Sequence, residues 1–422
     1  MKAYRDLFRT PGAAAFCVSG LITRSGGTMM GIGVVMMVTA QYGSYTLAGA
    51  VSATNAVAWA LGAAAMSNLV DRFGQRRVML PGAVVSSAVL AVLVVLGTLQ
   101  APAWTLFLPA AVSGAAAGAP GALVRARWAY VLNDTSRLHT AFSLESTLDE
   151  MTFVIGPVTA TALATSVAPA AGLVPPILLN VVGSLWFYSL RATEPPVKRK
   201  VVPPKLADAV LVAGEEPPRG LPLPRRKQWL LLAPGVALVA TVTLLVGTLF
   251  GAMDVTVVAA TESWDQKSLA GLVLGVVSLG SAIGGLGYGS RAWVVSLVRR
   301  WVVGVVFLAL ACLPFLVANQ VVFLSVAGFV AGFAIAPTFV NLNTLMQSLV
   351  SEARLTEGLG WVSTAVGVGV SIGSTLAGVL IDHISYRAGF VAVCAAGLAA
   401  AAFTVCSARS VSRSSRRLIP PV

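Results

Sequence analysis

Long stretches of this chain carry no charged side chain, and they limit what it can fold into. Residues 25–70, 78–124, 151–190 and 301–351 contain no Asp, Glu, Lys or Arg. A helix rises about 1.5 Å per residue, so about 20 apolar residues span the hydrocarbon core of a bilayer. Each stretch is therefore long enough for a pair of spans. The apolar residues run continuously instead of alternating, which favours helices over the strands of a membrane barrel.

Turn-forming residues divide these stretches into hairpins. The breaks are QYGSYT, GTLQAPAW, TSVAPAAG and VANQ, in which Gly, Pro and small polar residues favour a turn. Shorter apolar runs near 228–253, 268–290, 358–381 and 388–408 fit one span each. We therefore predict an all-α integral membrane protein with twelve transmembrane helices, arranged as two six-helix bundles.

The predicted bundles occupy residues 1–190 and 230–408. Between them, residues 191–229 are charged and rich in proline, which predicts a flexible cytoplasmic linker. Residues 409–422 carry several arginines and predict a basic cytoplasmic tail.

Basic residues gather on one side when twelve spans alternate from a cytoplasmic N-terminus. Of the 29 Lys and Arg residues, only Arg24, Lys267 and Arg387 lie elsewhere. Cytoplasmic loops are enriched in such cations, so both termini are predicted to be cytoplasmic, in a plasma membrane. Basic loops that face anionic lipid also explain the net charge of +13, and we expect no nucleic-acid partner.

Metal, cofactor and enzyme chemistry have no clear signal in the sequence. The histidines and cysteines lie apart, without the spacing of metal ligands, at Cys17, His139, Cys312, His383, Cys394 and Cys406. No phosphate-binding Walker loop and no paired nucleophile and base stand out, so we expect no cofactor, no ATP-driven pump and no membrane enzyme. The sequence GVGVSIG at 367–373 lies inside a span, where its glycines favour close helix packing.

An internal repeat links the two predicted bundles. A shift of 217 residues aligns Arg137-Leu138 with Arg354-Leu355 and Ser146-Thr147 with Ser363-Thr364. It also aligns two Ala-Pro pairs and two Ile-Gly pairs. An even number of spans separates the repeats, so both halves are predicted to have the same orientation in the membrane.

The loop between the second and third spans reads SNLVDRFGQRR, at residues 67–77. Together with the two parallel halves and the basic linker, it resembles the major facilitator superfamily, whose signature here is G-x-x-x-D-R-x-G-x-R-R/K. The matching residues are Asp71, Arg72, Gly74, Arg76 and Arg77, and Ser67 replaces the first glycine. The resemblance implies a transporter, usually monomeric, in which this loop closes a cytoplasmic gate and Asp71 helps to tie the halves together. Without the resemblance, the loop is an ordinary basic interfacial turn.

Three acids lie close together in the stretch AFSLESTLDEMTFVIGP at residues 141–157. A helix that begins near Leu138 places Glu145 and Asp149 four residues apart on one face, with Glu150 about 100° away. Ionised carboxylates at this depth need a basic partner, a hydrated cavity or a proton. Two neighbouring acids also disfavour each other's ionisation, which suits a group that takes up and releases protons.

Three arginines are available as partners for these acids: Arg24 in the first span, and Arg125 and Arg127 at the cytoplasmic end of the fourth. The 217-residue shift maps the acids, Arg125 and Arg127 onto uncharged positions of the second half. This asymmetry favours proton coupling or binding of a charged substrate group. The alternative is a buried ion-pair network that fixes the helices in register.

The acidic stretch ends in Gly156-Pro157, which predicts a helix bend. Exporting antiporters of the superfamily carry G-x-x-x-G-P-x-x-G-G in this helix, and only the central Gly-Pro remains here. Because this Gly-Pro pair is shared with the exporters, we predict proton-coupled export of a small organic molecule. Uptake by proton symport and a non-transporting membrane sensor with the same fold are the alternatives.

Three polar residues of the second half complete the candidate set. Asp254 is either an acid at the membrane rim or one that faces the cavity between the halves. Asn341 and Asn343, in the tenth predicted span, are expected to line that cavity through their amides.

Overall fold

The computed structural model describes residues 2–132, 135–196, 234–289, 293–350 and 355–416. The helices of the first half are α1 (Lys2–Leu7), α2 (Ala13–Tyr42), α3 (Tyr45–Phe73), α4 (Gln75–Thr98), α5 (Phe107–Ala117), α6 (Pro120–Val131), α7 (Thr135–Ser166) and α8 (Val174–Ser189). Those of the second half are α10 (Pro234–Ser263), α11 (Ala270–Gly289), α12 (Leu297–Cys312), α13 (Val321–Leu349), α14 (Leu355–His383) and α15 (Tyr386–Arg416). Short 3-10 turns extend several of them, among them η3 (Arg191–Thr193) after α8.

The membrane-spanning segments confirm the predicted fold class. Within the described residues, 11 helical segments are long and apolar enough to cross a membrane. The twelfth span is α7, which has 32 residues but carries the acidic stretch and is therefore less apolar. It begins at Thr135, slightly before the predicted start near Leu138. At the other end of the chain, α15 continues to Arg416, into the segment that was expected to be a tail.

The expected linker, residues 191–229, lies outside the described residues from residue 197 onward. Its first residues form η3, and Glu194 just after η3 accepts a hydrogen bond from the backbone N–H of Arg76 at the start of α4. We call the end of the helix bundle that carries η3 and the α3–α4 loop the linker end. The opposite end, which carries the α2–α3, α10–α11 and α14–α15 turns, is called the distal end.

The fourth predicted span is interrupted, because α5 and α6 are separate helices. Gly118 between them has φ 63°, in the left-handed region that favours glycine. Pro120 then opens α6, where its missing N–H is not needed. The Trp59 indole N–H donates to the Gly118 carbonyl at 2.8 Å and holds this break against α3. The break directs α6, with its two arginines, against α2 and α7.

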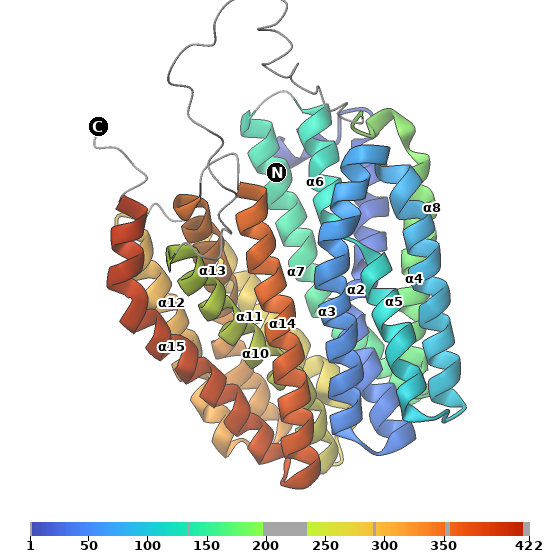
Figure 1. Ribbon diagram of the computed structural model, residues 1–422, viewed down its shortest axis with the longest axis vertical. Helices are drawn as coiled ribbons and strands as arrows, with labels where there is room; N and C mark the ends of the chain where they lie inside the picture. Colours follow the sequence, from blue (N-terminus) through green and yellow to red (C-terminus); the bar gives the residue numbers. More distant parts are fainter. Residues whose placement is uncertain (1, 133–134, 197–233, 290–292, 351–354, 417–422) are drawn as a thin grey trace, which may run out of the picture.

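The two halves meet most closely toward the distal end. Helices α3 and α14 run antiparallel, and a Cβ on Gly49 or Gly378 would collide with backbone atoms of the opposite helix. Helices α7 and α11 meet in the same way, because Gly271 lies against the Pro157 carbonyl. In Figure 1 the first half (blue to green) and the second half (yellow to red) converge at the lower end, whereas the upper ends of α3 and α14 are apart.

Glycines of the GVGVSIG sequence confirm the predicted close packing of helices. A Cβ on Gly369 would lie 2.1 Å from the Leu244 carbonyl oxygen, and one on Gly373 would lie 2.0 Å from that of Thr248. On the facing helix α10, Gly251 approaches the Val370 carbonyl in the same way. Small residues let two backbones approach closely, which is how helices associate in lipid. Helices α10 and α14 are therefore a closely packed pair within the second half.

Candidate functional site

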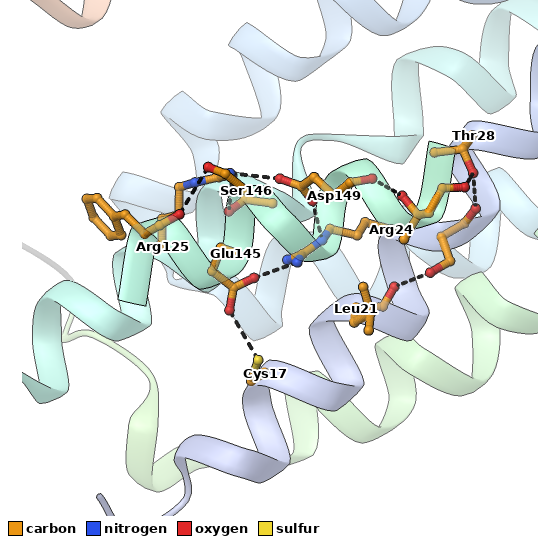
Figure 2. Close-up of polar contacts among 12 residues, drawn as sticks. Cys17, Leu21, Arg24, Thr28, Arg125, Glu145, Ser146 and Asp149 are labelled. Atoms are coloured by element: carbon orange, nitrogen blue, oxygen red, sulfur yellow. Dashed lines mark hydrogen bonds and ion pairs between the residues drawn. The ribbon is translucent and has the colours of Figure 1, made fainter. Parts of the chain in front are cut away.

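Glu145 of α7 lies at the centre of a charged cluster in the first half, and it is fully buried. Its Oε2 accepts a hydrogen bond from Arg24 Nη2 of α2 at 2.5 Å. Its Oε1 accepts from the Trp128 indole N–H at 2.7 Å and from the Cys17 thiol at 3.2 Å. Figure 2 shows Cys17 and Arg24 directed at this carboxylate from one helix. Both oxygens are therefore occupied, and water does not reach them.

Asp149 lies one turn further along α7 and is bound by two arginines. Arg24 Nε lies 2.6 Å from Asp149 Oδ1, and Arg125 Nη2 of α6 lies 2.7 Å from Oδ2 (Figure 2). The side chain of Asp149 is 29% exposed and that of Arg125 is 33% exposed, whereas that of Arg24 is only 8% exposed. Arg24 thus bridges the two acids of one helix face, which offsets the repulsion expected between them. The Asp149–Arg125 pair is the more exposed part of the cluster.

Helices α2 and α7 are held together next to this cluster. The Thr28 hydroxyl of α2 donates to the Thr152 carbonyl of α7 at 3.0 Å. Gly156 also lies against Thr28, where no larger residue fits. The following residue, Pro157, faces the other way and contacts α11 of the second half. The Gly-Pro pair therefore places α7 between α2 and the opposite half, and α7 remains helical through Pro157.

Glu150 points away from the other two acids, as the helical angle predicts. It is half-buried, and its carboxylate faces the Ser281 hydroxyl of α11. Ser281 itself is 3% exposed. Glu150 is thus an acid of the first half with a polar partner in the second half.

Arg127 does not join the cluster, so its predicted role as a partner of the acids is wrong. Residues two apart on a helix face in different directions, and Arg127 points away from α7. Its guanidinium donates to Gln75 Oε1 at 3.0 Å, to the Leu190 carbonyl at 2.9 Å and to Thr193 Oγ1 at 3.0 Å. It also lies 3.8 Å from the centre of the Phe187 ring. Arg127 therefore joins the α3–α4 loop to the end of α8.

The predicted gate motif forms this α3–α4 loop. Gly74 has φ 91° and ψ 158°, a conformation that only glycine adopts readily, and it both ends α3 and begins α4. The backbone N–H of Arg76 donates to the Glu194 carboxylate at 3.0 Å. Exposed side chains of the motif are Asp71, Arg72 and Arg77. The start of α4 is thus held through its backbone by Glu194, and the charged side chains of the loop are exposed.

Of the two asparagines expected to line the cavity, Asn341 is buried instead, at 1% exposure. Its Oδ1 accepts a hydrogen bond from the Tyr288 hydroxyl at 2.6 Å, and Arg300 donates to the same hydroxyl at 3.0 Å. The prediction for Asn341 is therefore wrong, because this amide belongs to the contact among α11, α12 and α13. Asn343 is half-buried on α13.

Asp254 lies inside α10 and not at the end of the helix. It precedes the end of the helix at Ser263 by about 14 Å along the axis. The side chain is half-buried, and no ion pair or hydrogen bond to it occurs among the described residues. One turn earlier, Phe250 stacks on Phe339 of α13, with ring centres 5.8 Å apart.

Several of these partners carry no charge and gave no sequence signal. Cys17 and Trp128 saturate Glu145, Ser281 meets Glu150, and Gln75 receives Arg127. Each becomes significant only through the helix that brings it opposite a charged group.

The geometry first defines a class. Two six-helix halves, joined through a long connection and holding buried charges between helices, are the architecture of a secondary transporter. The sequence profile of the Major Facilitator Superfamily matches residues 16–316 and 239–418. The chain belongs to the Major Facilitator Superfamily, and it is a membrane transporter and not an enzyme.

Solved structures with the same fold span nearly the whole chain. The nucleoside transporter NupG has a TM-score of 0.69 at 12% identity, and covers 95% of this chain and 99% of its own. A POT peptide transporter in complex with sulfate has a TM-score of 0.70 at 12% identity, with 97% and 96% covered. The human organic anion transporter MFSD10 has a TM-score of 0.64 at 16% identity, with 93% and 98% covered. No curated protein sequence matches the chain.

Proposed function

We propose that this protein exports a small organic molecule across the plasma membrane in exchange for protons, by alternating access between its two halves. The similar structures are those of nucleoside, peptide and organic anion transporters, which supports a small organic substrate. The basic residues at the linker end support a cytoplasmic location for that end. Protons would then enter from the distal side, and substrate from the linker side.

The observation that carries the proposal is the difference in exposure among three neighbouring acids. Glu145 is fully buried with both oxygens occupied, whereas Asp149 and Glu150 are partly exposed. A coupling group must exchange protons with water, so Asp149 and Glu150 carry this role in the proposal. Glu145 anchors Arg24 and keeps it beside Asp149.

Arg24 and Arg125 give protonation of Asp149 a mechanical consequence. While Asp149 is ionised, it pairs with both guanidinium groups. A proton on Asp149 removes the negative charge, and both ion pairs weaken. Arg125 is then free to contact a polar or anionic group of the substrate. Arg24 can contribute as well, because its Nη1 has no hydrogen-bond partner among the described residues while Asp149 is ionised. Proton and substrate would thereby bind to the same cluster in a coupled way.

Glu150 extends this coupling to the other half. Its carboxylate faces Ser281, and this contact crosses between α7 and α11, which belong to different halves. Protonation changes the carboxylate from an acceptor alone into a group that can also donate. The contact between the halves at this point therefore depends on the proton.

Purified protein in liposomes tests the proposal. A pH-sensitive dye inside the vesicles records proton movement when members of a substrate library are added. We expect Asp149→Asn and Glu150→Gln each to abolish substrate-driven proton movement while substrate binding remains measurable. Asp265→Asn, at an exposed acid of the distal end outside the cluster, is the matched control and should behave like the wild type. Normal proton coupling in both Asp149→Asn and Glu150→Gln would remove these acids from the coupling mechanism.

A further inference from the structure

Asp382 lies near the end of α14 and accepts three hydrogen bonds from the start of α3. The donors are the Tyr45 N–H at 2.9 Å, the Thr46 N–H at 2.7 Å and the Ser44 hydroxyl at 2.9 Å. Helix α3 belongs to the first half and α14 to the second. One carboxylate thus joins the two halves at the distal end.

This carboxylate completes the N-terminal cap of α3. The first four N–H groups of a helix have no partner within the helix. In α3, the N–H of Leu47 donates to Ser44 Oγ at 3.1 Å and that of Ala48 to the Ser44 carbonyl at 3.2 Å. The other two N–H groups bind Asp382 of the opposite half. Its negative charge also favours the positive end of the α3 dipole.

A second polar contact joins the halves beside the first. The Tyr45 hydroxyl donates to the Glu262 carboxylate at the end of α10. Glu262 also pairs with Lys267 at 2.7 Å, and the Lys267 ammonium group reaches the Thr39 hydroxyl of α2 at 3.4 Å. Two acids of the second half therefore hold the α2–α3 turn of the first half.

We propose that Asp382 is a conformational latch that holds the distal end closed and is released each time the transporter opens in that direction. This inference rests on the alternating access of the proposed function. Opening the distal end would separate α3 from α14 and expose the Tyr45 and Thr46 N–H groups to water. Asp382 is itself exposed, so water can replace its bonds. An exposed latch favours the closed state without trapping the protein in it.

Distances between spin labels test the latch without any substrate. In a Cys406→Ser background, which removes the exposed native thiol, one label pair at Val167 and Asn319 reports on the distal end. A second pair at Asn68 and Val294 reports on the linker end. All four label positions are exposed, and each pair has one label in each half.

We expect Asp382→Ala to enlarge the population with a long Val167–Asn319 distance and a short Asn68–Val294 distance. The expected increase is about five- to tenfold, similar to the loss of one helix cap. Ser44→Ala, which removes only the hydroxyl, should shift the populations in the same direction by a smaller factor. The control Asp265→Asn also removes a negative charge from the distal end, at a left-handed position that Asn tolerates, and should leave both distances unchanged.

Unchanged populations in both Asp382→Ala and Ser44→Ala, in protein that remains monodisperse, would overturn the latch. The result is separable from the proposed function because the labels respond to conformation alone. If the populations shift and no proton-coupled transport is found, the latch stands and the proposed function fails. If coupled transport is found and the populations do not shift, the latch alone fails.

Discussion

Glu145 and Asp149 are chemically similar acids four residues apart on α7, yet their surroundings give them different roles. The sequence was sufficient to place both on one face near Arg24 and Arg125, and these ion pairs are present. It could not distinguish a buried acid from an accessible one. That difference depends on Cys17 and Trp128, whose side chains carry no charge and reach Glu145 only in the folded protein.

The substitution Glu145→Gln tests this assignment. It leaves Arg24 buried with Asp149 as its remaining partner, and we expect it to lower the free energy of unfolding by about 3 kcal/mol, since breaking a buried pair costs about this amount. Thermal unfolding in detergent measures the effect. Glu150→Gln is the comparison, because Glu150 is partly exposed and takes no part in the ion pairs of Arg24. Equal losses of stability in the two variants would contradict the assigned difference.

At the scale of helices, the length of the apolar stretches and the turn-forming residues between them were enough to predict the spans, including α7 with its acids. The helical angle also predicts that residues two apart diverge, which is why Arg127 lies in the loop network and not beside Asp149. The break between α5 and α6 was not predicted, since Gly118 is one of many glycines and only its left-handed backbone sets it apart. The 217-residue repeat matches the structure closely: it maps the last residue of α7, Ser166, onto the last residue of α14, His383.

Two glycine-to-alanine substitutions, one in α10 and one in α14, should have opposite effects on stability. A Cβ on Gly251 would lie 1.9 Å from the Val370 carbonyl oxygen, so Gly251→Ala must separate the helices and should cost about 2 kcal/mol of stability. Gly360 of α14 has open space around it. There the same substitution should raise stability by up to about 1 kcal/mol, because alanine favours the helix. Midpoints of thermal unfolding compare the two, and a stabilised Gly251→Ala variant would refute the close packing.

For the whole molecule, the sequence predicted two parallel halves but not which end is closed. Two conformations of one transporter share the same helices and differ little in free energy, so composition and periodicity do not separate them. The distinction lies in contacts such as that of the Ser371 hydroxyl with the Ala53 carbonyl, at 2.9 Å between α14 and α3.

A disulfide across this contact should stop transport. We expect the variant Ala53→Cys with Ser371→Cys to lose transport on oxidation and to regain it on reduction, because the distal end cannot open. The pair Ser86→Cys with Ser113→Cys is the control. Its hydroxyls lie 3.4 Å apart within the first half, so a disulfide there leaves the halves free to move. Full transport by the oxidised inter-half variant would show that α3 and α14 need not separate.

The acids of α7 also bear on how the chain is assembled during synthesis. A helix with three acids inserts poorly into lipid alone, since each charge at the membrane centre is costly. The arginines that neutralise two of them lie in α2 and α6, which leave the ribosome before α7. We expect α7 to enter the bilayer efficiently only when these earlier helices are still next to the translocon. An insertion assay would then find α7 inserted into the membrane when residues 13–132 precede it. Insertion should fail when Arg24 and Arg125 are both replaced by alanine.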